Sequence, residues 1–290
     1  MKTNNNTEFI QLDLHIHSCL SACGSLEQSP SNLLPILCEK GISIAAITDH
    51  NSTLNYDAFF INSLKFNLCI FPAVEIQTEE EIHVIVVFPD KSKASNWQNW
   101  IDSIIPFVPL DAKFFGDEPV IDEDENIVMM CENLLTVSLP VSLTVLEMKA
   151  EKDNLIFFPA HINADTYSVI SQLGFIPPDH LFKIAEITRK EDLLYFEDNL
   201  NYNEKITFIT NSDSHYNEQI GKRFTRIYDK QLIENYIQYL LFIEEKKITK
   251  DNLDLYINTI EDLKVNIYNR LKYCLENLDD RRIVPFFVNL

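Results

Sequence analysis

Glycine is scarce in this chain, with five residues in 290, and long apolar segments are missing. The sequence has no Walker A loop and no Gly-x-Ser-x-Gly turn, so it supports neither a nucleoside triphosphatase nor a serine hydrolase. Its apolar runs are too short to span a bilayer. The opening stretch MKTNNNTEFI lacks the apolar core of a secretory signal. We therefore expect a cytoplasmic protein that does not bind a membrane.

Basic residues are also few, because 24 Lys and Arg stand against 44 Asp and Glu, which gives a formal net charge of -20. A surface this acidic repels the phosphate backbone, so stable non-specific binding to duplex nucleic acid is not expected. A bound metal ion would still reverse this field locally. The six cysteines are scattered along the chain, which argues against a disulfide framework and favours reduced thiols.

Seven short apolar runs, each ending in polar residues, predict the strands of an α/β protein. They are FIQLDLHIHS, ISIAAITDHN, LCIFPAVEIQ, EIHVIVVF, LIFFPAHI, FKIAEIT and KITFITNSDSH. Continuous apolar strands separated by helical segments are typical of a mainly parallel sheet covered by helices, either open or closed into a barrel. Seven strands favour the closed barrel.

The segments between and after these strands show helical spacing. Helices are predicted over residues 29–41, 91–105 and 129–152, the last interrupted at Pro140. From about residue 230 the chain again has helical spacing, with Asp251 as the expected cap between two helices. We therefore expect a barrel domain over 1–228 and a helical extension over 229–290. The extension would pack on the barrel or on a second copy of the chain, as in a homo-oligomer.

Residues 106–130 break this pattern and predict an inserted loop or hairpin. Six carboxylates lie between Asp117 and Glu125. Such a run of like charges is typical of a solvated face. The alternative is that the insertion forms a lid over a site.

The stretch DLHIHS raises the question of function. In an extended strand, Asp13, His15 and His17 point to one face while the leucines and isoleucine point to the other. Two adjacent imidazoles are a common beginning of a metal site, although a polar strand face is the simpler explanation. Six of the seven histidines fall at or next to the ends of predicted strands, and only His180 matches no motif. Ligands of α/β proteins gather at strand ends, so the pattern favours a metal site.

In chain order, DLHIHS, ITDHN, VEIQTEEEIHVIVVF, PAHI and NSDSH resemble the PHP (polymerase and histidinol phosphatase) family of metal-dependent phosphoesterases. The resemblance spans residues 10 to about 226, including the insertion FFGDEPVIDEDENIV, which is similar to one bacterial branch. It implies a distorted seven-stranded (β/α) barrel related to the TIM barrel. It also implies two or three divalent metal ions at the C-terminal ends of the strands.

Carried over residue by residue, the resemblance implies the following metal ligands. One metal would be held by His15, His17 and Asp213, a second by Glu75 as the bridge with His83 and His161, and a third by His50 and His215. Asp13 and Asp49 would orient imidazoles as hydrogen-bond acceptors, or instead cap backbone amides.

One departure from the family pattern affects the third site. Relatives have a further Asp or His after the His-x-His pair, where this chain reads SACGSLEQ. Ala22 has no ligand atom, so the ligand would be Cys23, Glu27, a water molecule or nothing. The alternatives are a small buried thiol for Cys23 and a carboxylate in a first helical turn for Glu27.

Imidazole and carboxylate ligands suit zinc, iron or manganese better than magnesium alone. The resemblance implies hydrolysis of a phosphoester by a metal-activated hydroxide. A third ion would stabilise the leaving alkoxide, and if that site is empty, His215 or His50 is the expected acid that protonates it. Arg189 and Arg223 are the candidate phosphate-binding cations, although such a residue is more often a solvated surface charge.

The scarcity of basic residues favours a small phosphorylated substrate: a nucleotide, a 3',5'-bisphosphate or a sugar phosphate. A 5'-3' exonuclease acting on short nucleic acid is the nearest alternative. Two further alternatives are a non-catalytic PHP-like regulatory or scaffold module and metal-dependent hydrolysis of a C–N bond.

Overall fold

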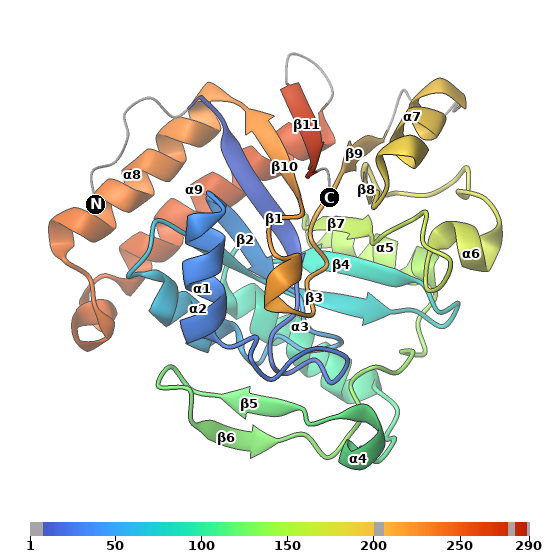
Figure 1. The fold of residues 1–290 in the computed structure, drawn as a ribbon, viewed down its shortest axis with the longest axis horizontal. Helices are drawn as coiled ribbons and strands as arrows, with labels where there is room; N and C mark the ends of the chain where they lie inside the picture. Colours follow the sequence, from blue (N-terminus) through green and yellow to red (C-terminus); the bar gives the residue numbers. More distant parts are fainter. Residues whose placement is uncertain (1–7, 200–205, 278–281, 289–290) are drawn as a thin grey trace.

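The computed structural model describes residues 8–199, 206–277 and 282–288. At its centre is a curled seven-stranded sheet with the strand order β11-β10-β1-β2-β3-β4-β7 (Figure 1). The strands are β1 (Ile10–Ile16), β2 (Ile44–Ile47), β3 (Cys69–Gln77), β4 (His83–Val87), β7 (Ile156–Pro159), β10 (Arg223–Tyr228) and β11 (Arg282–Phe287). Strands β8 (Ile184–Glu186) and β9 (Thr207–Ile209) form a separate parallel pair. The predicted mixed α/β class is confirmed.

All seven apolar runs form strands, but the expectation of a mainly parallel sheet is wrong. Within the seven-stranded sheet β1–β2 and β2–β3 are parallel, whereas β3–β4, β4–β7, β1–β10 and β10–β11 are antiparallel. The connection between β3 and β4, residues 78–82, allows a hairpin but is too short for a parallel crossover. The seven strands of the sheet are also not the seven that were predicted, because β10 and β11 belong to the sheet in place of β8 and β9.

The chain beyond β9 returns to the end of β1. Ile16 and Ser214 form an isolated parallel bridge, and the Asp213 amide donates to the His15 carbonyl at 2.9 Å. On the β8 side of the β8–β9 pair, the amide of Ile162, which follows β7, donates to the carbonyl of Glu186 in β8. The strand ends that carry the conspicuous histidines are therefore brought together. A complete barrel wall remains a prediction.

Helices cover the sheet, and two of the three predicted ones form as expected. These are α1 (Pro30–Glu39) and α3 (Lys91–Ile104), and the Asp90 side chain caps α3 by accepting from the Lys93 amide. The helix predicted over 129–152 is wrong in its first half, because α5 begins only at Leu143. Pro140 lacks an amide donor, and the Ser142 side chain caps α5 just after it.

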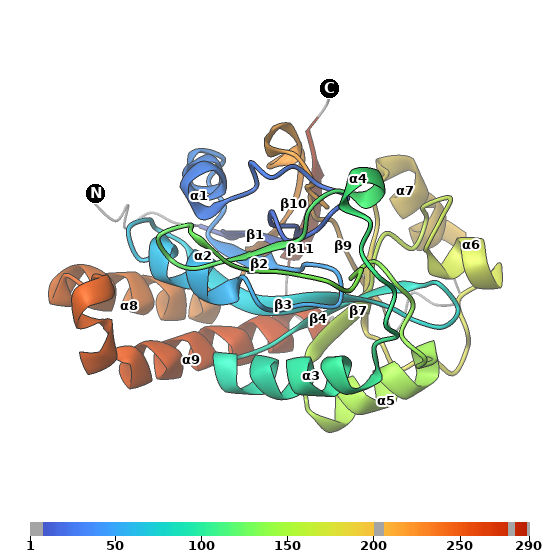
Figure 2. The ribbon, with the colours of Figure 1, turned by 90° about the horizontal axis from the view of Figure 1, so that it is seen from below.

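The remaining short helices are α2 (Tyr56–Ser63), α4 (Ala112–Phe115), α6 (Val169–Leu173) and α7 (Lys190–Asn199). Figure 2 shows α3 and α5 on one side of the sheet, with α1 and α4 on the other. Among the residues that the structure describes, no helix is both long and apolar enough to cross a membrane.

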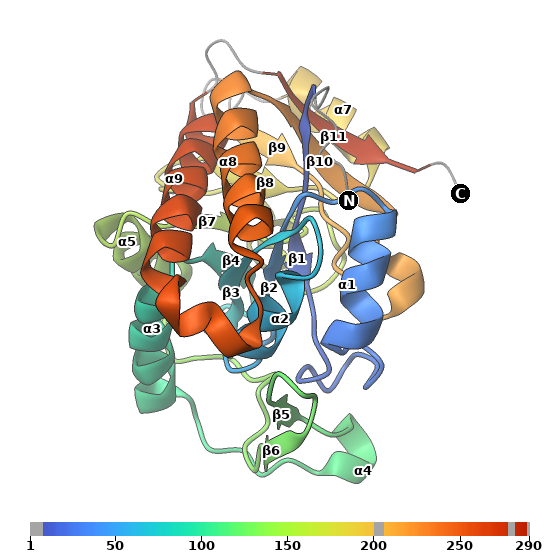
Figure 3. The same ribbon diagram turned by 90° about the vertical axis from the view of Figure 1, so that its left-hand side faces the viewer.

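The C-terminal helices share the main hydrophobic core with the sheet. Helices α8 (Lys230–Lys246) and α9 (Ile257–Glu276) lie side by side, joined by the 3-10 helix η2 (Lys250–Leu255) (Figure 3). Leu232, Tyr239 and Leu271 belong to one buried cluster with residues of β1, β2 and β3. Thr249, rather than Asp251, caps η2, because its position lets it exchange hydrogen bonds with Asn252. The domain boundary at 228/229 and assembly through these helices remain predictions.

The insertion forms the predicted hairpin, with β5 (Pro119–Ile121) paired antiparallel to β6 (Ile127–Met130). It is tied to the rest of the chain by Glu125, which accepts hydrogen bonds from both Ser29 and Ser31, and by Lys250, which pairs with Asp124 at 2.7 Å. The solvated acidic face is thus only partly present. Glu118 is fully buried.

Candidate metal centre

Glu75 of β3 lies at the centre of the histidine cluster. Its Oε1 is 2.9 Å from His83 Nδ1, 3.3 Å from His15 Nε2 and 3.6 Å from His161 Nε2. The carboxylate is 1% exposed, so these contacts are shielded from water. One buried oxygen therefore faces three imidazoles from three separate segments of the chain.

The second oxygen of Glu75 and the carboxylate of Asp213 complete the cluster. Glu75 Oε2 is 3.0 Å from His50 Nδ1 and 3.3 Å from His17 Nε2. Asp213 Oδ1 is 3.2 Å from His15 Nε2 and 3.6 Å from His17 Nε2. The two adjacent histidines of β1 thus lie between two carboxylates.

The strand pattern explains why residues so distant in sequence meet. His15 and His17 lie on one face at the end of β1, while His50 follows β2. Because β4 is antiparallel to β3, its first residue, His83, lies at the same edge as the ends of the parallel strands. Strand β7 is antiparallel to β4, so its end, followed by His161, lies at this edge too. The structure therefore brings together all eight residues for which the resemblance implies metal binding.

The donor atoms form three overlapping groups, each with its ligand atoms within 4.8 Å of one another. The groups are His15, His17 and Asp213; His50, Glu75 and His83; and His17, His50 and His215. Imidazole nitrogens mixed with carboxylate oxygens suit divalent zinc, manganese or iron. His15 Nε2 and His17 Nε2 face each other at 3.3 Å, and the buried His161 Nδ1 has no hydrogen-bond partner among the described residues. This donor set fits a divalent metal.

Burial and charge act against each other in these groups. Burial favours neutral His17, but its contacts with Asp213 and Glu75 outweigh that effect and raise its pKa to about 9. Burial lowers the pKa of His50 to about 4, and burial together with the charge of His17 lowers that of His215 to about 3. Burial opposes ionisation of Glu75, yet the surrounding histidines hold its pKa well below the usual range. A cation can replace the protons held beside these carboxylates.

Comparisons with known proteins rest on structure, since no family model and no curated protein matches the sequence. The lesion-specific endonuclease PfuEndoQ from Pyrococcus furiosus is similar over 97% of this chain and 59% of its own, with a TM-score of 0.63 and 14% identity. Endonuclease Q in complex with a 27-mer duplex substrate carrying an abasic lesion is similar over 76% of this chain and 53% of its own, with a TM-score of 0.53 and 16% identity.

The chain has an endonuclease Q-like fold. The expected PHP-type fold is thereby confirmed, because endonuclease Q is a PHP-type protein. An amidohydrolase from Chromobacterium violaceum is also similar, over 72% of this chain and 89% of its own, with a TM-score of 0.50 and 13% identity. The chain spans only 59% and 53% of the two endonuclease Q chains, so the likeness covers part of those proteins.

Glu186 lies directly behind the histidine cluster, and the sequence analysis missed it. Its Oε2 lies 2.9 Å from His15 Nδ1, and it also accepts from the His161 amide at 2.9 Å. A carboxylate on the far nitrogen fixes the tautomer of a ring and leaves Nε2 free for a ligand. The sequence did contain a signal for Glu186, because it is a charged residue near the end of the otherwise apolar strand predicted over FKIAEIT, and the other site residues also lie at strand ends.

The two aspartates expected to orient imidazoles have different contacts. Asp13 Oδ1 accepts from the amides of Ser212 at 3.0 Å and His15 at 3.4 Å, which corresponds to the amide-capping alternative. Asp49 accepts from the Ser21 hydroxyl at 2.7 Å, and that hydroxyl lies 2.9 Å from His17 Nδ1. Asp49 therefore contacts an imidazole through Ser21.

The candidates for an extra ligand of the third site differ in position. Cys23 Sγ is 3.3 Å from His50 Nε2. The Glu27 side chain is exposed, and neither residue belongs to the three donor groups found among the described residues. His180 stacks on Phe182 with ring centroids 3.9 Å apart, away from the cluster.

The two arginines expected to bind phosphate have partners within the protein. Arg189 Nε donates to Asp192 at 2.6 Å. Arg223 donates to the carbonyls of Asn211 at 2.9 Å and Ser212 at 2.7 Å. Arg223 therefore supports the segment that carries Asp213. Phosphate binding by either arginine remains a prediction.

Two of the predicted ligands have a backbone conformation that non-glycine residues seldom adopt. His161 has a φ of 30° and Asp213 a φ of 50°, both in the left-handed region. Such conformations cost about 1–3 kcal/mol each and cluster at functional sites. The strain is consistent with a chain held in place so that His161 faces Glu75 and Asp213 faces His15 and His17.

Proposed function

We propose that this chain is a metal-dependent phosphoesterase that hydrolyses small phosphorylated substrates at the Glu75 cluster. The observation that supports this most strongly is the convergence of five buried imidazoles on one carboxylate at the strand ends. In α/β folds that edge is where ligands bind. The endonuclease Q-like fold is consistent with the proposal.

The proposal assigns a role to each side chain. His15, His17 and Asp213 would hold one ion, and Glu75 would bridge to a second with His83 and His161. Ions bound here would polarise a phosphate oxygen and lower the pKa of a bound water. Glu186 would keep His15 Nε2 free to bind by accepting from Nδ1.

The roles of His50 and His215 depend on their protonation. Both pKa values lie below the ordinary range for histidine, at about 4 and about 3, so both rings are neutral at pH 7 in the chain alone. Neutral imidazoles suit ligands better than acids. We therefore propose that they bind a third ion. Protonation of the leaving oxygen by either ring, the role expected from the sequence, would need a proton that the neutral ring does not carry at pH 7.

The net charge of -20 favours a small phosphoester such as a nucleotide, a 3',5'-bisphosphate or a sugar phosphate. A second candidate is cleavage of nucleic acid, either from a 5' end or at a lesion. The likeness to endonuclease Q, which was solved with a duplex substrate, favours it.

The test is hydrolysis by metal-replete protein of nucleotides, bisphosphates and sugar phosphates, measured as released phosphate, and of short oligonucleotides and a duplex with an abasic site, measured as strand cleavage on a gel. An amide substrate, followed by release of its amine, completes the panel. The His15→Ala, His17→Ala double variant is the control. Hydrolysis of a phosphoester that the control loses would support the proposal, and the best substrate would separate the two candidates. No phosphoester hydrolysis above the control would contradict both, and amide hydrolysis alone would favour the C–N alternative.

A further inference from the structure

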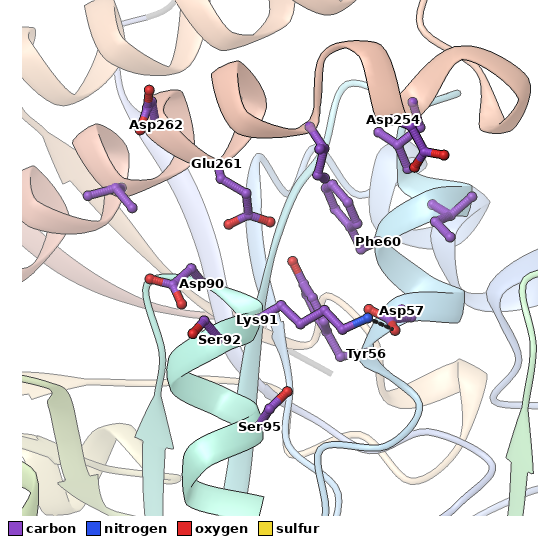
Figure 4. A pocket seen from close by; sticks show the side chains of 14 residues that line it. Tyr56, Asp57, Phe60, Asp90, Lys91, Ser92, Ser95, Asp254, Glu261 and Asp262 are labelled. Atoms are coloured by element: carbon purple, nitrogen blue, oxygen red, sulfur yellow. Dashed lines mark hydrogen bonds and ion pairs between the residues drawn. The ribbon is translucent and has the colours of Figure 1, made fainter.

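A second cavity lies away from the metal centre, between α2, the start of α3, η2 and α9 (Figure 4). Its volume is about 680 Å³, within the range of small-molecule sites. It shares no lining residue with the Glu75 cluster. We call it the α2–α9 cavity. Its walls combine apolar side chains, among them Phe60, Ile257 and Val265, with carboxylates.

The charges around the α2–α9 cavity have one dominant sign. Five carboxylates line it: Asp57, Asp90, Asp254, Glu261 and Asp262. The one basic side chain of the lining is Lys91, and its Nζ forms an ion pair with Asp57 Oδ2 at 2.5 Å. Among the described residues, the other four carboxylates form no ion pair, so acidic side chains outnumber basic ones in the lining by five to one.

Glu261 supplies a separate observation. Its Oε2 is buried and has no hydrogen-bond partner among the described residues. Figure 4 shows its carboxylate directed into the space between Asp90 and Tyr56. Burial raises the pKa of Glu261. A buried acceptor without a donor is costly, and a ligand that donates a hydrogen bond would remove that cost.

We propose that the α2–α9 cavity binds an organic cation with an apolar body, of the alkyl-ammonium class, whose ammonium group donates to Glu261. The apolar walls bury the body of the ligand, and the carboxylates neutralise its charge. A hydrated metal ion fits less well, because it requires an oxygen shell and gains nothing from Phe60 or Ile257. An anion would be repelled.

The buried lysine beneath the cavity does not supply the missing cation. Lys264 is fully buried and donates to the Tyr56 hydroxyl, with its ammonium 4.5 Å from the centre of the Phe60 ring. It forms no direct ion pair with Glu261 among the contacts of the described residues, and the two charges attract each other only at longer range. Glu261 Oε2 therefore still has room for a direct donor from a ligand.

The test is isothermal titration calorimetry of the full chain with diaminooctane and with octanediol, which share the apolar chain and differ in charge. We expect diaminooctane to bind at least roughly tenfold more tightly than octanediol, and Glu261→Gln to weaken it about fivefold or more, as for loss of a charge-assisted hydrogen bond. Glu244→Gln, an exposed carboxylate on α8 outside the cavity, is the matched control and should bind like the unaltered chain.

Equal binding of the diamine and the diol would overturn the proposal, as would an unchanged affinity in Glu261→Gln or an equal loss in Glu244→Gln. No heat of binding with millimolar diamine would overturn it too. Magnesium chloride that displaces the diamine at equal concentration would point to a metal-ion site instead, against the proposal. Should Glu261→Gln fail to fold, Asp254→Asn on the exposed rim replaces it, with the same expected loss.

Discussion

At the scale of single residues, hydrogen bonds behind the ligand atoms fix the orientation of the imidazoles. His15 has Glu186 on Nδ1, and His17 has Ser21 on Nδ1, with Asp49 accepting from Ser21. In both rings Nε2 is the nitrogen that faces the carboxylates in front. Orientation of the rings, as well as their number, therefore decides whether an ion can bind.

Glu186→Gln should lower metal affinity about 10–100-fold, because an amide is a weaker acceptor for His15 Nδ1–H than a carboxylate. Metal content after dialysis against a chelator, measured with phosphate release, checks this. Glu147→Gln is the control, since Glu147 of α5 is also buried but accepts a hydrogen bond from the amide of Leu181, outside the metal cluster. Equal metal loss in both variants would show that any buried glutamate has this effect.

Lys264 gives a prediction about stability. Tyr56→Phe removes the one hydrogen-bond acceptor found for its buried ammonium among the described residues, so the free energy of unfolding should fall by about 1–3 kcal/mol. Lys264→Met removes the buried charge itself and should be nearly neutral or stabilising. Urea unfolding of both variants measures the difference. A loss in Lys264→Met as large as that in Tyr56→Phe would refute this reasoning.

At the scale of elements, local sequence predicted which segments are strands but not how they pair. The apolar runs are equally compatible with parallel and antiparallel neighbours, so the direction of β4 depends on the short connection over 78–82. Strand β10, with the sequence RFTRIY, lacks a continuous apolar run and was missed. Strand β11 contains one, but it lies within the segment over 229–290 that was predicted to be entirely helical, so that prediction is wrong for its last part. The helix predicted from residue 129 overlaps the exposed strand β6, which belongs to the hairpin predicted over 106–130, and the hairpin is the prediction that holds there.

The hairpin contributes a pH dependence through Glu118. Burial raises its pKa from 4.5 to about 7. The unfolded chain therefore releases this proton at lower pH than the folded chain, and stability decreases as pH rises from about 4.5 to about 7. Glu118→Gln removes this contribution and keeps an acceptor for the Leu135 amide.

Relative to the unaltered chain, Glu118→Gln should gain up to about 3 kcal/mol of unfolding free energy between pH 4.5 and pH 7.5. Denaturant unfolding at the two pH values measures the gain. A stability difference between the two proteins that does not change with pH would show that Glu118 ionises normally in the fold.

At the scale of the whole molecule, the order of the motifs predicted the cluster that the structure assembles. Because strand ends meet at one edge, residues from His15 to His215 could be assigned to one site without knowing the pairing of the strands. Glu186 was missed because a single glutamate in a short strand carries no distinctive spacing. The partners of Arg189 and Arg223 depend on loop geometry, which the sequence does not specify.

The most direct test of the central claim is to measure bound metal and phosphate release together in Glu75→Gln. Glu75 contacts five imidazoles, so its loss should remove at least one bound ion per chain and reduce phosphate release about 1,000-fold or more. Glu79 is exposed and close to Glu75 in sequence, so Glu79→Gln should retain both the bound metal and the phosphate release. Full metal content and full activity in Glu75→Gln would contradict a hydrolytic metal centre built around this carboxylate.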